Sequence, residues 1–269
     1  MLEKIAERIK SLPPLPRSFH EISEICNNID SSINDLANVI EKDPMLVANL
    51  LKVANSPLYS FRIEIKNVLQ AVSLFGMSTT RSLVTDMSIK KLLNVDMAPY
   101  GVTPEEFASI SGLQSALMMH WYKEVDSSKV EILFLSALLQ ETGKILIADE
   151  IVKNDETYQF KSAIESSTNI ASVEQSFVGT TSGEITSRIF QHWQFDEFMV
   201  QAIKYSDDVD AAPLEVRPFA LALKVVKVAV PMNSPLSERS ITIALNLVTK
   251  ENLNEAAFAT AIEQLLEHY

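Results

Sequence analysis

The chain has 269 residues, 47% of them hydrophobic and 22% charged, which allows a sizeable core in one large or two smaller domains and excludes intrinsic disorder. Its net charge of −12 disfavours direct binding to nucleic acid, because no cluster of basic residues offsets the repulsion by phosphates. A single cysteine, Cys26, excludes an internal disulfide and a cysteine-based zinc cluster.

The sequence contains no secretory signal and no run of apolar residues that could span a bilayer. The apolar stretch of residues 132–139, which Ser136 interrupts, is far shorter than the roughly 20 residues that a membrane-spanning helix needs. We therefore expect a cytoplasmic protein that does not act in a membrane.

Apolar residues recur at helical spacing along nearly the whole chain, and only residues 217–230 are rich enough in β-branched residues to fit a strand as well. In that segment Lys224 and Lys227 lie three residues apart on one face, which favours a helix. The sequence thus predicts an all-α, multi-helical fold. The expected helices cover about residues 2–10, 19–29, 33–40, 44–54, 65–75, 80–92, 104–121, 128–139, 144–152, 158–166, 171–177, 181–193, 195–203, 217–230, 241–247 and 253–266.

Proline and glycine concentrate in residues 97–104, and this is the best candidate for a domain boundary. Thr103 and Pro104, followed by two glutamates, form a strong helix start just beyond it. We therefore expect an N-terminal helical bundle over residues 1–97 and a second helical domain over residues 98–269.

The segment of residues 43–61, DPMLVANLLKVANSPLYSF, combines a strong helix start with an apolar helix. Asp43 can accept from the free N–H groups of the first turn, and Pro44 suits the first helical position. Between residues 45 and 54 only Asn49 and Lys52 are polar, which predicts a helix buried around its whole circumference.

The same helix has a clear end signal. Asn55 suits the left-handed conformation that often follows a helix, and the next residues, Ser56 and Pro57, cannot easily continue it. On physical grounds alone, the segment is a core helix with good caps.

This segment nevertheless resembles the signature of the HDOD family of bacterial signalling modules. The similarity consists of LPxLP near the start, DP before an apolar helix, LxxANSxxY, and then AVSLFG, and it continues over nearly the whole chain. The resemblance implies a helical bundle packed on a degenerate HD-like helical domain. It also implies either a family-specific surface or a set of caps, formed by Asp43, Pro44, Asn55, Ser56 and Pro57.

The second half of the chain resembles the HD superfamily of metal-dependent phosphohydrolases, in which histidines and an aspartate hold metal ions that activate water. The expected motif LLHDIGK reads LLQETGK at residues 138–144, so that Gln140 replaces the histidine and Glu141 the aspartate. No histidine lies near residues 110–112, where an earlier ligand is expected. The positions of the later ligands fall on Ser182 and on the pair Ser206 and Asp207.

The resemblance therefore implies a chain with no catalytic residue, no bound metal and no cofactor. The histidines that are present, His20, His120, His192 and His268, lie at unrelated positions, and two of them precede a tryptophan at an expected helix end. The degenerate pocket would consist of Gln140, Glu141, Lys144, Ser182, Ser206 and Asp207.

Charged residues around this motif suggest how the pocket could be stabilised. We hypothesise that Lys144 pairs with Glu141 across one helical turn and replaces the positive charge of the metal. For Asp207 and its neighbour Asp208 we expect solvated or salt-bridged roles.

Taken together, these features predict a non-catalytic regulatory module that acts on protein partners in bacterial signalling, without nucleic acid or membrane. One alternative is a nucleotide-sensing module, in which the vestigial pocket binds a ligand and Lys144, Arg188 and Lys204 contact its phosphates. The other alternative is a divergent metal-dependent phosphohydrolase that uses Glu141 and Asp207.

Overall fold

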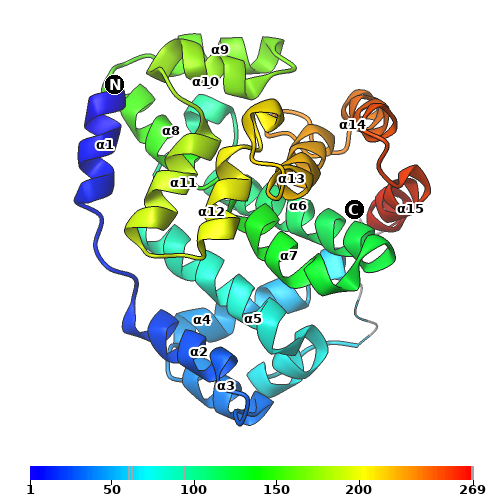
Figure 1. Cartoon of the computed structure of the whole chain (residues 1–269). Helices are drawn as coiled ribbons and strands as arrows, with labels where there is room; N and C mark the ends of the chain where they lie inside the picture. The colour runs from blue at the N-terminus through cyan, green and yellow to red at the C-terminus, as the bar shows by residue number, and fades with distance from the viewer. Residues whose placement is uncertain (60, 62, 94, 268–269) are drawn as a thin grey trace. The chain divides into compact units, whose positions relative to one another are not determined.

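The computed structural model describes residues 1–59, 61, 63–93 and 95–267, and all of the regular structure in them is helical (Figure 1). The predicted all-α fold is confirmed, and residues 217–230 fall almost entirely in a helix, α13 (Arg217–Ala229). His268 lies outside the described residues.

The chain forms two compact units. The small unit comprises Pro13–Leu92, and the large unit comprises Met1–Leu12 and Leu93–Leu266. The chain thus begins in the large unit, whereas the division expected from the sequence grouped residues 1–12 with the N-terminal bundle. The reason is that the first helix buries Ile5 and Ile9 against helices of the large unit.

The small unit is a bundle in which three short helices pack on a longer one, α5. Gly76, with φ of 79°, breaks α5 near its middle, as the sequence suggests. The elements are α2 (Arg17–Asn27), α3 (Ile33–Ile40), α4 (Pro44–Ala54), η1 (Pro57–Tyr59) and α5 (Val68–Leu92).

Helix α4 differs from the expectation in how it is buried. Leu46, Leu50 and Ala54 are buried along one face, whereas the side chain of Met45 is 58% exposed. The prediction that α4 is buried around its circumference is therefore wrong. A bundle of this size packs each helix along one face, so the remaining apolar residues of α4 stay partly accessible.

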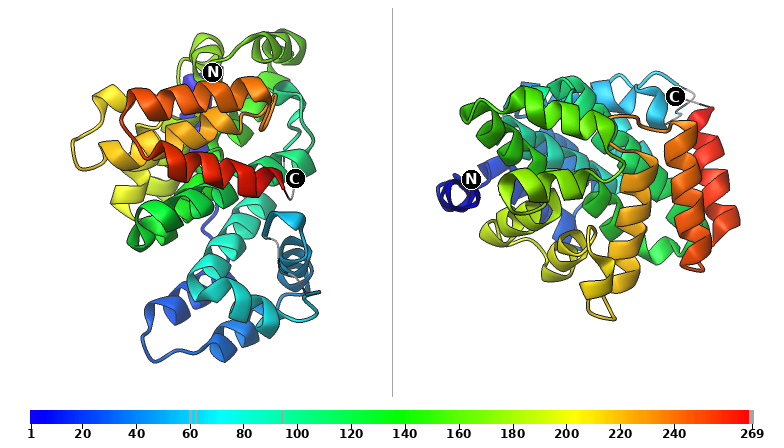
Figure 2. Two further views of the ribbon diagram at one scale, coloured as in Figure 1. Left: turned by 90° about the vertical axis from the view of Figure 1, so that its right-hand side faces the viewer. Right: turned by 90° about the horizontal axis from the view of Figure 1, so that it is seen from above.

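The large unit is built around α6 and α7, which pack closely against each other. Helices α13, α14 and α15 lie side by side on one side of this unit (Figure 2). The elements are α1 (Leu2–Lys10), η2 (Ala98–Tyr100), α6 (Pro104–Val125), η3 (Ser127–Lys129), α7 (Val130–Leu139), α8 (Gly143–Lys153), α9 (Thr157–Ser166), α10 (Ile170–Val178), α11 (Ser182–His192), α12 (Glu197–Lys204), η4 (Val209–Ala211), α13, α14 (Glu238–Lys250) and α15 (Glu255–Leu266).

Helix starts follow the capping signals of the sequence. Thr103 caps α6, where its hydroxyl accepts from the Glu106 N–H and the Glu106 carboxylate accepts from the Thr103 N–H.

None of the helices in the described part of the chain is long and apolar enough to cross a membrane.

Candidate functional site

The site begins at the turn between α7 and α8, where the chain makes a close approach to α11. The N–H of Gly143 donates to Thr186 Oγ1 at 2.8 Å. A Cβ on residue 143 would lie 2.3 Å from the carbonyl oxygen of Ser182, so only glycine fits here. This contact holds the first turns of α8 and α11 together and places Lys144 beside Ser182.

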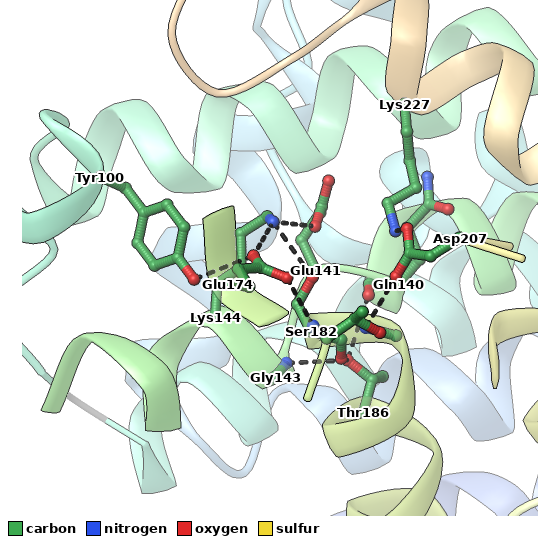
Figure 3. A network of polar contacts seen from close by, with 12 residues as sticks. Tyr100, Gln140, Glu141, Gly143, Lys144, Glu174, Ser182, Thr186, Asp207 and Lys227 are labelled. Carbon is green, nitrogen blue, oxygen red and sulfur yellow. Dashed lines mark hydrogen bonds and ion pairs between the residues drawn. The ribbon is translucent and has the colours of Figure 1, made fainter. Parts of the chain in front are cut away.

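Lys144 lies at the centre of a buried polar group, which we call the Lys144 cluster: Lys144, Glu141, Glu174, Ser182 and Tyr100 (Figure 3). Its Nζ lies 2.5 Å from Glu174 Oε1 and 3.2 Å from Glu141 Oε2. It also donates to Ser182 Oγ at 3.1 Å and lies 5.1 Å from the centre of the Tyr100 ring. The predicted pair of Lys144 and Glu141 is therefore present, and a second carboxylate joins it.

Glu174 connects the cluster to two further elements. Its Oε1 accepts from the Tyr100 hydroxyl at 3.0 Å, and its Oε2 accepts from the Ser182 backbone N–H at 2.6 Å. The residue is fully buried. The Glu174 carboxylate thus accepts from Tyr100 and Ser182 and pairs with Lys144, so that it joins η2, α8, α10 and α11.

The electrostatic environment fixes the protonation states of Lys144 and Tyr100. Burial alone would lower the pKa of Lys144, but the carboxylates of Glu141 and Glu174 outweigh it and raise that pKa above its usual value. Burial and the nearby Glu174 raise the pKa of Tyr100 well above its usual value. At neutral pH Lys144 is therefore a cation and Tyr100 a neutral donor.

Two glutamines extend the network behind Glu141. Gln114 of α6 donates through Nε2 to Glu141 Oε1 at 3.2 Å and to the Val230 carbonyl at 2.9 Å. Gln140 donates to Gln114 Oε1 at 2.8 Å. Within the described residues, Gln140 Oε1 and Glu141 Oε2 are buried and accept no hydrogen bond. Gln140 thus acts as a donor that orients Gln114.

A second ion pair lies close by, on the other side of the first turn of α11. Lys227 of α13 lies 2.6 Å from Asp207 Oδ1 and donates to Ser206 Oγ at 3.3 Å, while the Gly183 N–H donates to Asp207 Oδ2 at 3.3 Å. Burial would raise the pKa of Asp207, but the Lys227 ammonium outweighs it and lowers that pKa. Of the two roles expected for Asp207, solvated or salt-bridged, the structure places it in a salt bridge.

These residues do not fit the divalent metal centre that the HD resemblance implies. The space between Glu141 and Glu174 already holds the charged Lys144 Nζ, which would repel a metal ion. Asp207 is likewise engaged by Lys227. No group of three or more histidine, cysteine, aspartate or glutamate side chains in the described residues is placed to hold a metal.

A hollow of about 660 Å³ opens next to Asp207, between α10, α11, α12 and η4. The charged residues in its lining are the acidic Glu184, Asp207 and Asp208 and the basic Lys204. Arg188 is exposed elsewhere on α11 and does not line it. The three cations considered for phosphate binding therefore do not converge, because Lys144 is buried in its cluster.

The signature residues of the small unit act locally on α4. Asp43 caps the helix, accepting from the N–H groups of Met45 at 2.9 Å and Leu46 at 3.3 Å, and Pro44 occupies the first position. Pro57 opens η1, and Ser56 Oγ is buried without a hydrogen-bond partner in the described residues.

Asn55 does more than end the helix. Its Nδ2 donates to the carbonyls of Leu51 at 2.9 Å and Ile65 at 2.8 Å, and its Oδ1 accepts from the Ile65 N–H at 2.8 Å. Its φ of −90° is not left-handed, so the conformation expected from the sequence is wrong. The side chain itself supplies the connection, by pairing with the backbone of the segment that leads into α5.

Four of the six predicted pocket residues lie in or directly beside the Lys144 cluster: Gln140, Glu141, Lys144 and Ser182. Asp207 forms the adjacent ion pair with Lys227, whose Nζ also donates to Ser206 Oγ. The sequence reasoning missed Glu174, Tyr100 and Gln114. A signal for Glu174 exists, because this acid lies on the face of α10 that also carries Val178 and is buried. No comparable pattern marks Tyr100, which follows a proline in a turn.

Comparison with known proteins shows the family to which most of the chain is similar. The model of the HDOD domain matches residues 12–209, well over half of the chain. An uncharacterized protein of Treponema pallidum (strain Nichols) is 22% identical over 224 residues, which is 80% of this chain and 41% of that protein. The chain therefore spans only about two fifths of the length of this curated relative.

Solved structures share the fold at low sequence identity. A Shewanella amazonensis SB2B protein whose name proposes a phosphohydrolase has a TM-score of 0.71 and 20% identity, over 98% of this chain and 96% of that chain. A Marinobacter aquaeolei VT8 protein whose name proposes a role in signal transduction has a TM-score of 0.69 and 19% identity, over 96% of this chain and 57% of that chain. These likenesses show an HD-like helical fold. With the family match over residues 12–209, they lead to one conclusion: the chain belongs to the HDOD domain family.

Proposed function

We propose that this chain is a non-catalytic regulatory module of bacterial signal transduction that acts through contacts with protein partners. One observation carries the proposal. At the position where HD enzymes hold a metal with a His-Asp pair, a lysine ammonium lies between two buried carboxylates, those of Glu141 and Glu174.

This arrangement supports a structural role for the former centre. A catalytic metal needs anionic or imidazole ligands and an open position for water. Here the ligand position of the histidine is taken by Gln140, which donates to Gln114, and the acid that follows is paired with Lys144. The cluster ties η2, α8, α10 and α11 together, and its two carboxylates share one ammonium, that of Lys144.

The phosphohydrolase alternative requires Glu141 and Asp207 as ligands or bases. Each of them is paired with a lysine of its own, at 3.2 Å for Lys144 and 2.6 Å for Lys227. Both carboxylates would have to exchange a buried ion pair for a metal ion or a substrate, and leaving a buried lysine unpaired is costly. We therefore do not favour this alternative.

The nucleotide-sensing alternative has no specific support either. The hollow beside Asp207 has the size of a ligand site. Its lining is mainly acidic, because Glu184 and Asp208 also line it and Lys204 is the basic residue there. Such a lining repels phosphate groups. We therefore favour a module whose surface is bound by another protein.

The catalytic part of this proposal is tested by assaying the purified chain on phosphate monoesters and diesters with Mg²⁺, Mn²⁺ or Zn²⁺. We expect no turnover and no metal-dependent rise in melting temperature. Metal-dependent hydrolysis that disappears in Glu141→Gln would contradict the proposal. A rise in melting temperature with a cyclic dinucleotide but without metal would favour the sensor instead.

The regulatory part is tested by affinity capture from the cytoplasm of the source cell, followed by titration of the purified captured protein against this chain. We expect saturable binding that needs neither added metal nor nucleotide. Binding that occurs only when a nucleotide is present would contradict direct recognition of the protein surface.

A further inference from the structure

Helix α1 belongs to the large unit, although the chain leaves that unit directly after it. It lies at the edge of the unit, alongside α8 and α11 (Figure 1). Residues 13–92 then form the small unit before the chain returns, so α1 is held in the large unit by non-covalent contacts with helices that come much later in the sequence. The match to the family model begins at residue 12, and α1 lies outside it.

One face of α1 supplies the apolar part of these contacts. Ile5 and Ile9 lie about one helical turn apart and are buried, whereas Glu3, Glu7 and Lys10 are exposed. A helix of only nine residues is marginal on its own in water, so α1 is stable where this face is covered. The surface of α8 and α11 that α1 covers, which we call the α1-binding surface, thus accommodates a short amphipathic helix.

Charge restricts the kind of amphipathic helix that fits. Lys4 Nζ lies 3.5 Å from Glu150 Oε1, and Arg8 pairs with Asp149. Each of these basic residues directly precedes a buried isoleucine of α1, so the α1-binding surface matches a basic residue followed by an apolar one, repeated after four residues. The net charge of −12 also attracts a basic helix, whereas acids at these positions would face acids.

The two acids of the α1-binding surface have further partners on or next to α8. Lys153 Nζ lies 2.6 Å from Asp149 Oδ2, and Asn154 Nδ2 donates to Glu150 Oε1 at 2.9 Å. Neither carboxylate therefore loses its last partner when α1 leaves. The cost of an unpaired buried charge does not oppose the exchange of α1 for another helix.

We propose that the α1-binding surface is where the protein partner binds, and that the partner supplies a basic amphipathic helix that replaces α1. This inference rests on the proposed function, because it names the surface and the chemistry of that partner. The exchange releases the N-terminal attachment of the small unit, which then stays joined to the large unit only after Leu92.

The test uses the native chain and a synthetic peptide with the sequence of residues 1–12, which carries the required pattern. Fluorescence anisotropy of the labelled peptide measures binding, and hydrogen exchange of the isotope-labelled chain measures protection with and without excess peptide. We expect saturable binding and a loss of protection in α1 but not in α6 or α7. A peptide that combines Lys4→Glu with Arg8→Glu should bind at least about tenfold more weakly.

Ile5→Glu in the full chain tests whether α1 competes with the peptide. The substitution puts a charge on the buried face of α1 and leaves α8 and α11 unchanged. We expect this variant to bind the peptide at least about tenfold more tightly than the native chain does, because α1 occupies less of the surface. Ile5→Ala replaces it if Ile5→Glu does not fold. Glu3→Ala, at an exposed position of the same helix, should bind like the native chain.

The outcomes separate this inference from the proposed function. A native chain that does not bind the peptide would overturn the inference even if Ile5→Glu binds it, because α1 would then be a permanent part of the large unit. Equal affinity for the charge-reversed peptide would overturn it as well. A native dimer that the peptide dissociates, measured by light scattering, would assign the surface to α1 of a second copy instead. The proposed function survives the first two results, since a partner can bind another surface, and metal-dependent hydrolysis by the native chain would contradict it whatever the peptide does.

Discussion

The protonation of Tyr100 makes the stability contributed by the Lys144 cluster depend on pH. It donates to Glu174 at 3.0 Å, and its pKa is raised well above the usual value by burial and by Glu174. The unfolded chain loses this proton at about pH 10, whereas the folded chain keeps it. The stabilisation is therefore complete below about pH 10 and is lost as the pH rises towards the folded-state pKa.

We predict that the free energy of unfolding, measured by urea titration, falls above about pH 10 with a slope that Tyr100→Phe reduces by about 1.4 kcal/mol per pH unit. Lys144, whose pKa is also raised, contributes to the remaining slope. The matched control is Tyr158→Phe, because the side chain of Tyr158 is 82% exposed. Equal slopes for the native chain and Tyr100→Phe would show that Tyr100 is not held protonated by the cluster.

A second prediction for a single residue concerns Asn55. Its side chain makes three hydrogen bonds with the backbone of Leu51 and Ile65. Because these bonds lie at a partly accessible place, Asn55→Ala should lower the free energy of unfolding by about 1–2 kcal/mol. No side-chain hydrogen bond of Asn49 is found among the described residues, so Asn49→Ala on the same helix is the control.

The same variant decides whether Asn55 also belongs to a binding surface. If Asn55→Ala binds a captured partner as tightly as the native chain does, the residue is structural. Weaker binding at unchanged stability would mean that the signature segment is recognised directly.

Gln140, Glu141 and Lys144 could be proposed from the sequence because they lie in a segment that resembles the LLHDIGK motif. It could not identify Glu174 or Tyr100 as their partners, because these residues come from other elements and meet Lys144 only after α8, α10 and η2 have packed. Pairing across a helical turn is a local property, whereas pairing across three elements depends on the tertiary fold.

At the scale of elements, the contact of α8 with α11 determines the geometry of the site. A Cβ at residue 143 would meet backbone atoms, with Ser182 O at 2.3 Å and Thr186 N at 2.9 Å. A Cβ at residue 183 would meet the Asp207 carboxylate at 2.7 Å and the Ile203 carbonyl oxygen at 3.0 Å. Its shortest contact is thus with a side chain, which can move more easily than a backbone, and its backbone contact is longer than that of residue 143.

We therefore predict that Gly143→Ala lowers the free energy of unfolding by about 1–3 kcal/mol or more, and that Gly183→Ala costs less. Urea titrations of the two variants measure the difference. A smaller cost for Gly143→Ala than for Gly183→Ala would contradict the close approach of α8 and α11.

The helices themselves were largely predictable, because apolar spacing and caps such as Thr103 are local signals. The sequence did not reveal which faces of α4 are covered. Apolar composition alone cannot distinguish a fully enclosed helix from one that packs along a single face, because that depends on how many neighbours the fold supplies.

At the scale of the whole molecule, the chain starts in the large unit, passes through the small unit and returns. Ile5 and Ile9 of α1 are 2% and 6% exposed, and α1 packs on α8 and α11. Arg8 also pairs with Asp149 of α8. This placement could not be read from the sequence, because the Leu12–Pro16 segment signals a turn but not the direction of packing.

Ile5→Ala should therefore destabilise the large unit by about 2–5 kcal/mol, through the lost burial and the cavity that remains. Hydrogen exchange is the suitable measurement, and the loss of protection should appear in α8 and α11. Glu3→Ala, at an exposed position of the same helix, is the control. Loss of protection confined to α2–α5 would contradict the assignment of α1 to the large unit.

The most direct test of the account is the metal content of the native chain. Protein produced in medium supplemented with manganese, iron and zinc is purified without chelator and analysed for bound metal, next to Glu141→Gln prepared in the same way. Because Lys144 supplies the cation between Glu141 and Glu174, we predict far less than one metal ion per chain in both samples. One metal ion per native chain, lost in Glu141→Gln, would show that Glu141 helps to bind a metal and would contradict the account.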